Sequence, residues 1–309
     1  MTNYARLSER PRKFQALSGY TSEEFQALLP AFESVFQKRM QAFTLDGKER
    51  QKRSYVTYSN CPLPTMEDKL LFVLMYLRKA TTQDIFGEVF NMPQPVVNKW
   101  IHILHPCLNQ ALYTLGEIPA RSAVDLQLPA EEDLLYFQDG TERPVQRPKN
   151  PEAQRTLYSG KKKRHTVKNN VLVNKQAKIS LLTITCEGKK HDKKIADETG
   201  FTLPEGSCLY QDTGFQGFAL AGVTIIQPKK KPRGGELTLE EKELNRQISS
   251  IRIRVEHAIG GVKRYRIVKD PLRCWKEDFR DRVMETCCGL HNFRLNFRPW
   301  FYDTIPIKL

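Results

Sequence analysis

Long apolar runs are scarce in this chain of 309 residues. The longest uninterrupted run is the eight residues 70–77, which is far short of the ~20 that a membrane-spanning helix needs. The N-terminus opens with polar and basic residues rather than an apolar segment. We therefore expect neither a membrane protein nor a secreted one. The length favours about two domains, each able to bury a core without disulfide bonds.

Paired cysteines are also missing. The seven cysteines form no Cys-x-x-Cys motif, and the one Cys-x-x-His spacing, Cys288 to His291, has no partner pair with which to bind zinc. An odd, uneven set of thiols favours a reduced compartment, so we expect a cytoplasmic protein. The cysteines are Cys61, Cys107, Cys186, Cys208, Cys274, Cys287 and Cys288.

Negative charge is in short supply. The chain has 49 Lys and Arg against 35 Asp and Glu, which gives a formal net charge of +14. Residues 147–178 alone contribute +9 of it, and residues 229–233 and 252–273 carry two further basic clusters. One such cluster is equally well explained as a solvated surface. Three in one half of the chain favour a polyanionic partner, because each phosphate that a cation neutralises releases counterions.

A helix-turn-helix pattern follows a polar, helix-leaning segment of residues 1–60. Thr65 is placed to cap a buried helix over 66–77, a short helix surrounds Phe86, and a break at 91–92 precedes a third helix that begins near Pro93. The second helix of such a motif enters the DNA major groove, although an ordinary three-helix bundle has the same pattern. The side chains expected to face DNA are Gln94, Asn98, Lys99 and His102.

The pattern changes from helical to strand-like after a Pro-rich linker at 117–132. Five strands are predicted at 134–139, 167–174, 179–186, 207–212 and 223–227, with a possible extension of the first through Val145 beyond a Gly turn. Helices are predicted over 191–199, 238–268 and 281–297. The fold class is therefore α/β, with an all-helical N-terminal part followed by a mixed-sheet domain.

Two predicted strands end in an aspartate. Alternate residues share a face of a strand, which puts Asp139 in line with Phe137 and Asp212 in line with Tyr210. Both acids precede turn-forming residues at the strand end, where open α/β sheets hold ligands. Asp-Gly and Asp-Thr-Gly are also common simply as turns.

A third acid lies on the predicted long helix. Arg252, Glu256, Gly260 and Lys263 share one helical face. This arrangement is either a surface ion-pair ladder or a metal-binding acid between two phosphate-binding cations. Three carboxylates from two strands and a helix suit a pair of Mg²⁺ ions, because Mg²⁺ prefers oxygen ligands.

Several blocks in order make the chain resemble a known family over roughly residues 65–297. It is similar to the insertion-sequence DDE transposases, most of all to the bacterial group related to the Harbinger-type DDE endonucleases. The blocks are Asp139-Gly-Thr-Glu-Arg-Pro-Val, Tyr158-Ser-Gly-Lys-Lys-Lys-Arg-His-Thr-Val-Lys, Gly188-x-x-His191-Asp192, Gln211-Asp212-Thr-Gly-Phe-Gln-Gly217 and Arg252-x-x-x-Glu256-His-x-x-Gly260-x-x-Lys263.

The resemblance implies a helix-turn-helix at 61–116, an RNase H-like catalytic domain at 133–297 and a tail at 298–309. It implies Asp139, Asp212 and Glu256 as a catalytic triad holding two Mg²⁺ ions, for which Mn²⁺ could substitute. DNA contacts would come from Lys162, Lys163, Arg164, His165, Arg252 and Lys263. Ser249 stands where some relatives have tyrosine, so only the Arg, Glu and Lys of that signature carry over.

The expected partners are the terminal inverted repeats of a mobile element and a target DNA, both bound by a homodimer or larger synaptic complex in a prokaryotic nucleoid. Two other functions stay open. One is a domesticated, non-cleaving DNA-binding protein, and the other is a Mg²⁺-dependent nuclease without strand transfer.

Three further residues in these blocks have competing interpretations. Asp192 follows His191 at a helix start and is expected to be an N-cap, with a metal-adjacent role as the alternative. Glu142 is a second acid near Asp139. His257 points about 100° away from Glu256 on the helix and is expected to be structural or DNA-facing rather than a metal ligand.

Overall fold

A computed structural model describes residues 2–51, 54–128, 134–274, 276 and 278–302. Part of the predicted linker and most of the predicted C-terminal tail lie outside these residues. The chain forms two compact units. The helical unit comprises Met1–Ile118, Arg264–Asp270 and Arg282–Phe297, and the sheet unit comprises Pro119–Lys263, Pro271–Asp281 and Arg298–Leu309. No helix among the described residues has the length and apolar character of a membrane span.

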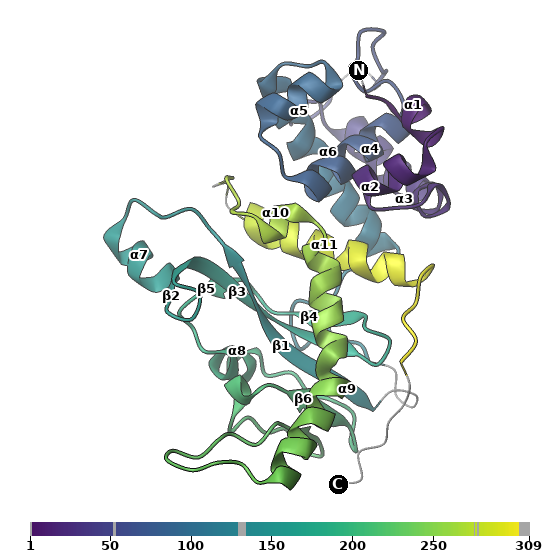
Figure 1. Cartoon of the computed structure of the whole chain (residues 1–309). Coiled ribbons are helices and arrows are strands. Elements are labelled where there is room, and N and C mark those ends of the chain that lie inside the picture. The colour runs from purple at the N-terminus through teal and green to yellow at the C-terminus, as the bar shows by residue number, and fades with distance from the viewer. Residues whose placement is uncertain (1, 52–53, 129–133, 275, 277, 303–309) are drawn as a thin grey trace. The chain divides into compact units, whose positions relative to one another are not determined.

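The helical unit begins with α1 (Tyr4–Ser8), α2 (Pro11–Ser18) and α3 (Ser22–Ala42) (Figure 1). Thr21 and Glu24 form a reciprocal capping box at the start of α3, which satisfies two otherwise unpaired backbone amides. Phe25, Phe32 and Phe36 lie on one face of this helix and are fully buried. The apolar face of α3 therefore forms one side of the hydrophobic core of the helical unit.

The predicted helix-turn-helix consists of α4 (Met66–Lys79), α5 (Gln83–Phe90) and α6 (Gln94–Thr114). Thr65 caps α4 as expected, accepting a hydrogen bond from the Asp68 amide. Asn91 takes a left-handed conformation, with φ of 54°, in the turn between α5 and α6. A Cβ on Gly87 would lie 2.4 Å from the Met92 carbonyl oxygen, so only glycine lets this turn fold back onto α5.

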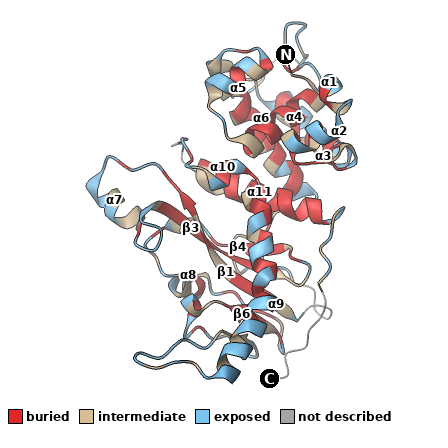
Figure 2. Ribbon diagram, in the orientation of Figure 1, coloured by how far each residue is buried: buried red, intermediate tan, exposed pale blue. Residues whose placement is uncertain are grey.

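The chain's last helices complete the helical core. α10 (Arg266–Lys269) and most of α11 (Phe279–Leu295) belong to the helical unit, although more than a hundred residues of sheet unit precede them. Cys287, Cys288 and Leu290 of α11 are fully buried, and the Tyr20 hydroxyl donates to the Leu290 carbonyl at 2.7 Å. α11 is buried to this degree because helices before and after the sheet unit share one core (Figure 2).

His105 of α6 gives the helical unit a specific acid sensitivity. Its ring nitrogen lies 3.0 Å from Thr286 Oγ1, and burial lowers its pKa to about 3. The folded state binds this proton more weakly than the unfolded state does, so stability is complete above pH 6.5 and is lost as the pH falls towards 3. Between pH 6.5 and 5 we expect a loss of about 2 kcal/mol.

Urea unfolding at several pH values checks this expectation. His105→Gln should be less stable at pH 7 but should show a flatter dependence on pH below 6.5. An exposed histidine offers the control, since His257→Gln should leave the acid slope unchanged. A His105→Gln protein with the wild-type slope would assign the acid sensitivity to other groups.

The sheet unit is built on strands in the order β2-β3-β1-β6-β7, with β4 and β5 also paired to β3. β1 runs antiparallel to β3 and parallel to β6, and β6 runs parallel to β7, so the sheet is mixed as predicted. The strands are β1 (Leu135–Pro144), β2 (Tyr158–Ser159), β3 (Arg164–Asn174), β4 (Ile179–Leu182), β5 (Cys186–Glu187), β6 (Cys208–Gln211) and β7 (Thr224–Ile226).

Three predicted elements differ in the structure. β1 continues through Gly140 without a turn, because β3 pairs with it along its whole length and holds Gly140 opposite Asn170. The predicted strand 179–186 is divided into β4 and β5, which pair with different parts of β3. The predicted helix 238–268 ends at Lys263 as α9 (Leu239–Lys263), and the chain then enters the helical unit.

Helices cover both faces of the sheet. On one face, α8 (Asp192–Thr199) contributes Ala196 to a core that includes Tyr136, Leu209 and Phe215. On the other face, α9 packs against β1 and β6 (Figure 1). There Phe137 stacks on Tyr210 with ring centroids 5.5 Å apart, and the Arg254 guanidinium lies 5.5 Å from the centre of the Phe137 ring. The odd-numbered residues of β1 therefore face α9.

Candidate functional site

Asp139 lies in β1 and Asp212 directly follows the parallel neighbour β6, on the face of the sheet that α9 covers. The register pairs Phe137 with Tyr210 and Gln138 with Gln211, so each aspartate follows a paired position. Asp139 is within β1, whereas Asp212 directly follows β6 and caps the short 3₁₀ helix Thr213–Phe215. The structure thus brings together the two acids that the sequence pattern singled out.

Local backbone geometry orients both carboxylates. Asp139 Oδ1 accepts from the Gly140 amide at 2.7 Å, and Asp212 Oδ1 accepts from the Thr213 amide at 2.6 Å. The second oxygen, Oδ2, accepts no hydrogen bond from a described residue in either case. Each side chain is fixed through one oxygen and keeps the other available for a ligand.

The environment of Asp139 is short of positive charge. Burial raises its pKa to about 6, Arg252 opposes the rise, and the neighbouring Asp212 and Asp192 carboxylates reinforce it. Negative charge that Arg252 alone does not balance favours a bound cation in this half-buried place. Hard carboxylate oxygens are the ligands that Mg²⁺ and Mn²⁺ prefer, so this donor set fits a divalent metal ion.

The cations of α9 face the aspartates. Arg252 is 8% exposed and close enough to lower the pKa of Asp139, and its buried Nε donates to no described residue. Lys263 has a pKa lowered by burial and by Lys162, while Asp139 and Glu142 act in the opposite direction. Both cations therefore border the acidic site, and a substrate phosphate would give the Arg252 donor a partner.

Glu256 is one turn beyond Arg252 on α9 and is exposed. Within the described part of the chain, no three Asp, Glu, His or Cys side chains lie close enough together to hold one metal ion. The structure thus brings together Asp139, Asp212, Arg252 and Lys263, while Glu256 is exposed and forms no metal-binding cluster with the aspartates among the described residues.

Asp192 is not the helix N-cap that the sequence predicted. His191 occupies that position, and Asp192 is the first residue of α8. A Cβ on Gly140 would lie only 2.4 Å from Asp192 Oδ1, so the carboxylate packs directly on the β1 backbone beside Asp139. The sequence expectation was wrong because α8 begins at the sheet, where this side chain has a tertiary partner.

That partner is Lys168 of β3, which sequence reasoning did not select as a site residue. Its Nζ lies 3.2 Å from Asp192 Oδ1 and 3.6 Å from Glu142 Oε1, and it donates to the Lys190 carbonyl at 3.0 Å. A lysine in the middle of an otherwise apolar and amide-rich strand is the signal that could have revealed this cluster.

The basic segment from Lys162 to His165 forms the turn between β2 and the start of β3. Lys162, Lys163 and Arg164 are exposed, and His165 is half-buried. Lys162 and Arg164 both lower the pKa of Lys263, so this turn lies near the cationic end of α9. Lys162 and Arg164 therefore add positive charge near the acidic site, at the end of α9 where Lys263 lies.

The predicted DNA-facing residues of α6 are partly exposed and already engaged within the helical unit. Gln94 and Asn98 both donate to Gln83 Oε1 of α5. Lys99 Nζ lies 2.5 Å from Asp46 Oδ1. His102 is also partly exposed. An amide cluster and one ion pair thus occupy the surface that the motif would present to a major groove.

Asp46→Asn should tighten DNA binding by the helical surface, because the change releases Lys99 and removes a charge that repels phosphate. The pair is exposed, so the gain should be small, about two- to fivefold. Fluorescence anisotropy with a duplex at fixed salt measures it. Asp46→Asn combined with Lys99→Ala should lose the gain, and unchanged affinity of the single variant would show that Asp46 does not compete with DNA.

His257 contacts an aromatic pair near the chain's end. Its Nδ1 lies 3.1 Å from the Tyr302 hydroxyl, and its ring is edge-on to Trp300 with centroids 4.7 Å apart. No metal-binding cluster includes it among the described residues. These contacts give His257 a packing role.

Comparisons with known proteins agree with this architecture. Residues 138–292 match a family described as the DDE superfamily endonuclease, and residues 61–114 match the helix-turn-helix of DDE superfamily endonuclease. The chain is 25% identical over 284 residues to the probable transposase for insertion sequence element IS702 of Microchaete diplosiphon. The aligned region covers 92% of this chain and 95% of that protein. No solved structure matches it. The family match takes in half of the chain, from Gln138 beside the first aspartate to Asn292 in α11. We conclude that this chain belongs to the DDE superfamily endonucleases.

Proposed function

We propose that this protein is a DNA transposase that binds the ends of its own element, cleaves DNA strands there and joins them to a target. The observation that carries the proposal is that Asp139 and Asp212 each directly follow the last paired residues of the adjacent parallel strands β1 and β6, with Arg252 and Lys263 near them. The similarity to a probable transposase of Microchaete diplosiphon agrees with it.

Asp139, Asp212 and Glu256 would hold two Mg²⁺ ions, for which Mn²⁺ would substitute. The ions would supply the Lewis acid that assists both the attacking water or hydroxyl and the leaving oxygen. Asp139 must lose its proton to bind a cation, and its pKa of about 6 makes binding weaken below that pH. Glu256 would complete the ligand set from α9.

The cations have separate proposed roles. Arg252 and Lys263 would bind the phosphates on either side of the reacting bond, and Lys162, Lys163, Arg164 and His165 would hold the donor strand. Gln94, Asn98, Lys99 and His102 would read the element end. Residues 61–116 would thus recognise DNA and residues 133–297 would cleave it, in a homodimer or larger complex in the nucleoid of a prokaryotic cytoplasm.

The test is an assay of the full chain on a supercoiled plasmid that carries the inverted repeats flanking its gene. Nicked, linear and joined products should appear with Mg²⁺ and disappear with EDTA. Glu256→Gln should remove them while DNA binding persists, and Glu240→Gln, a change at an exposed acid of the same helix, should keep them. Cleavage without joined strands would indicate a nuclease, and binding without cleavage by the wild type would indicate a DNA-binding protein only.

A further inference from the structure

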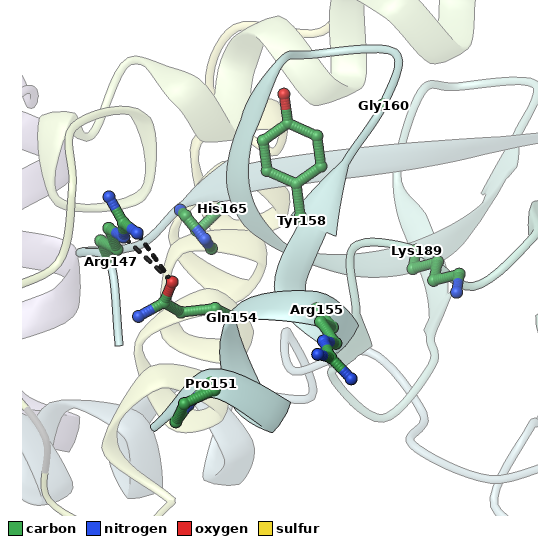
Figure 3. Close-up of a pocket in the computed structure, with 8 residues that line it drawn as sticks. All are labelled: Arg147, Pro151, Gln154, Arg155, Tyr158, Gly160, His165 and Lys189. Carbon is green, nitrogen blue, oxygen red and sulfur yellow. Dashed lines mark hydrogen bonds between the residues drawn. The ribbon is translucent and has the colours of Figure 1, made fainter. Parts of the chain in front are cut away.

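A basic hollow lies beside the site, formed by α7 (Pro151–Leu157) and the start of β3. Its volume is about 820 Å³, within the range of cavities that bind small molecules and ample for one nucleotide. Figure 3 shows side chains from the helix, β2 and β3 gathered around it. The lining residues that matter are Arg147, Gln154, Arg155, Tyr158, His165 and Lys189.

The cations of this hollow are available to an anion. Arg155 and Lys189 are exposed, and the side chain of neither forms an ion pair or hydrogen bond with a described residue. Arg147 donates through Nε and Nη2 to Gln154 Oε1 at 3.1 and 2.9 Å, which fixes its guanidinium at the rim (Figure 3). Among the described residues that line the hollow there is no carboxylate, so its charge attracts phosphate.

An aromatic surface lies among these cations. Tyr158 is 44% exposed, and its ring meets His165 edge-on with centroids 5.6 Å apart. Exposed aromatic rings between cations are typical of proteins that bind unpaired nucleotides, because a base can stack on the ring while its phosphate meets a cation. Bases inside a duplex are already stacked on each other and cannot use such a ring.

The hollow adjoins the proposed catalytic site. His165 lines the hollow and also belongs to the basic turn 162–165. Two other residues of that turn, Lys162 and Arg164, lower the pKa of Lys263. Asp139 also affects the pKa of Lys263, and Tyr158 contacts His165, so this turn lies between the first aspartate and the hollow. A strand separated from its complement at the cleavage point would meet this surface.

We propose that the hollow binds one unpaired nucleotide of a DNA strand, with the base stacked on Tyr158 and the phosphate held by Arg155 and Lys189. This inference rests on the proposed function for its biological setting. It can be tested without cleavage and without the sequence of the element ends.

Binding is measured by anisotropy in EDTA with the full chain carrying Asp139→Asn. The two probes are a blunt duplex of about 20 base pairs and the same duplex with a tail of about six thymidines. The tailed probe should bind more tightly, and Tyr158→Ala should weaken its binding about fivefold or more while the blunt probe is unaffected. Tyr158→Phe keeps the ring and should bind like the parent, as should Tyr113→Ala, which removes an exposed tyrosine from α6.

The phosphate contacts have their own readout. Arg155→Ala and Lys189→Ala should each weaken binding of the tailed probe and lower its salt slope by about one. Equal binding of tailed and blunt probes, or full affinity in Tyr158→Ala, overturns the proposal. Either result leaves the transposase proposal intact, because that proposal depends on Mg²⁺-dependent cleavage by the wild type.

Discussion

Asp139→Asn is expected to lower the rate of Mg²⁺-dependent cleavage about a thousandfold or more. At neutral pH we expect the same variant to be more stable to unfolding than the wild type. Asparagine keeps the shape of the side chain and its hydrogen bond from Gly140, but it removes the charge that would bind a cation. Plasmid cleavage at saturating Mg²⁺ gives the first result. Asp212→Asn should show the same loss of activity.

The gain in stability follows from the raised pKa of Asp139. Burial lifts it from 3.8 to about 6, so the folded state binds the proton more tightly than the unfolded state. Ionising the group therefore costs nothing below about pH 4, and the cost grows to about 1–3 kcal/mol above pH 6. The asparagine variant avoids this cost, and its advantage should increase as the pH rises through that window.

Urea unfolding in EDTA at pH 4 and pH 7.5 measures the difference. Asp197→Asn, which changes an exposed acid paired with Lys193, supplies the control without such a gain. Full cleavage by Asp139→Asn would remove this residue from the proposed triad. Equal stability of variant and wild type at pH 7.5 would instead show that the charge is solvated in the folded protein.

Lys168→Met is expected to destabilise the protein by about 3 kcal/mol. Lys168 is 8% exposed and lies between the carboxylates of Glu142 and Asp192. Methionine fills the space but leaves two acids facing each other with no cation between them. The 24% exposure of the Asp192 side chain allows some solvation, so the effect should fall at the low end of the range for buried pairs.

Chemical unfolding of single and double variants separates charge from packing. Glu142→Gln should restore part of the stability lost in Lys168→Met, because it removes one of the two carboxylates that the variant leaves without a cation. Lys193→Met breaks an exposed ion pair with Asp197 and should change the free energy of unfolding by less than about 0.5 kcal/mol. If Lys168→Met were as mild as Lys193→Met, the buried cluster would not contribute to stability.

Much of the secondary structure could be predicted from the sequence, because it depends on residues that are close together in the chain. The Thr65 cap, the break at Asn91 and the run of apolar residues after Thr65 specify the helix-turn-helix without help from distant residues. Alternating and continuous apolar runs likewise located the strands. The predicted turn at Gly140 failed because the long pairing of β1 with β3 outweighs a local turn preference.

The site was predictable in part. Asp139 and Asp212 were found because each follows a run of apolar strand residues, although Asp139 lies inside β1 and only Asp212 stands at a strand end. The cluster of Lys168 with Glu142 and Asp192 was not found, because its members come from β3, β1 and α8 and their contact depends on how α8 starts against the sheet.

The sequence by itself determined which segments become helices and strands and which acids and cations are available for chemistry. Those properties depend on neighbours a few residues away. Only the tertiary structure decided that α11 shares a core with the N-terminal helices, that Arg252 faces Asp139 while Glu256 is exposed, and that Tyr158 borders a basic hollow. These contacts between distant residues depend on the order of the strands and on how the helices pack. Both arise from the burial of apolar surface over the whole chain, so they leave no local signal in the sequence.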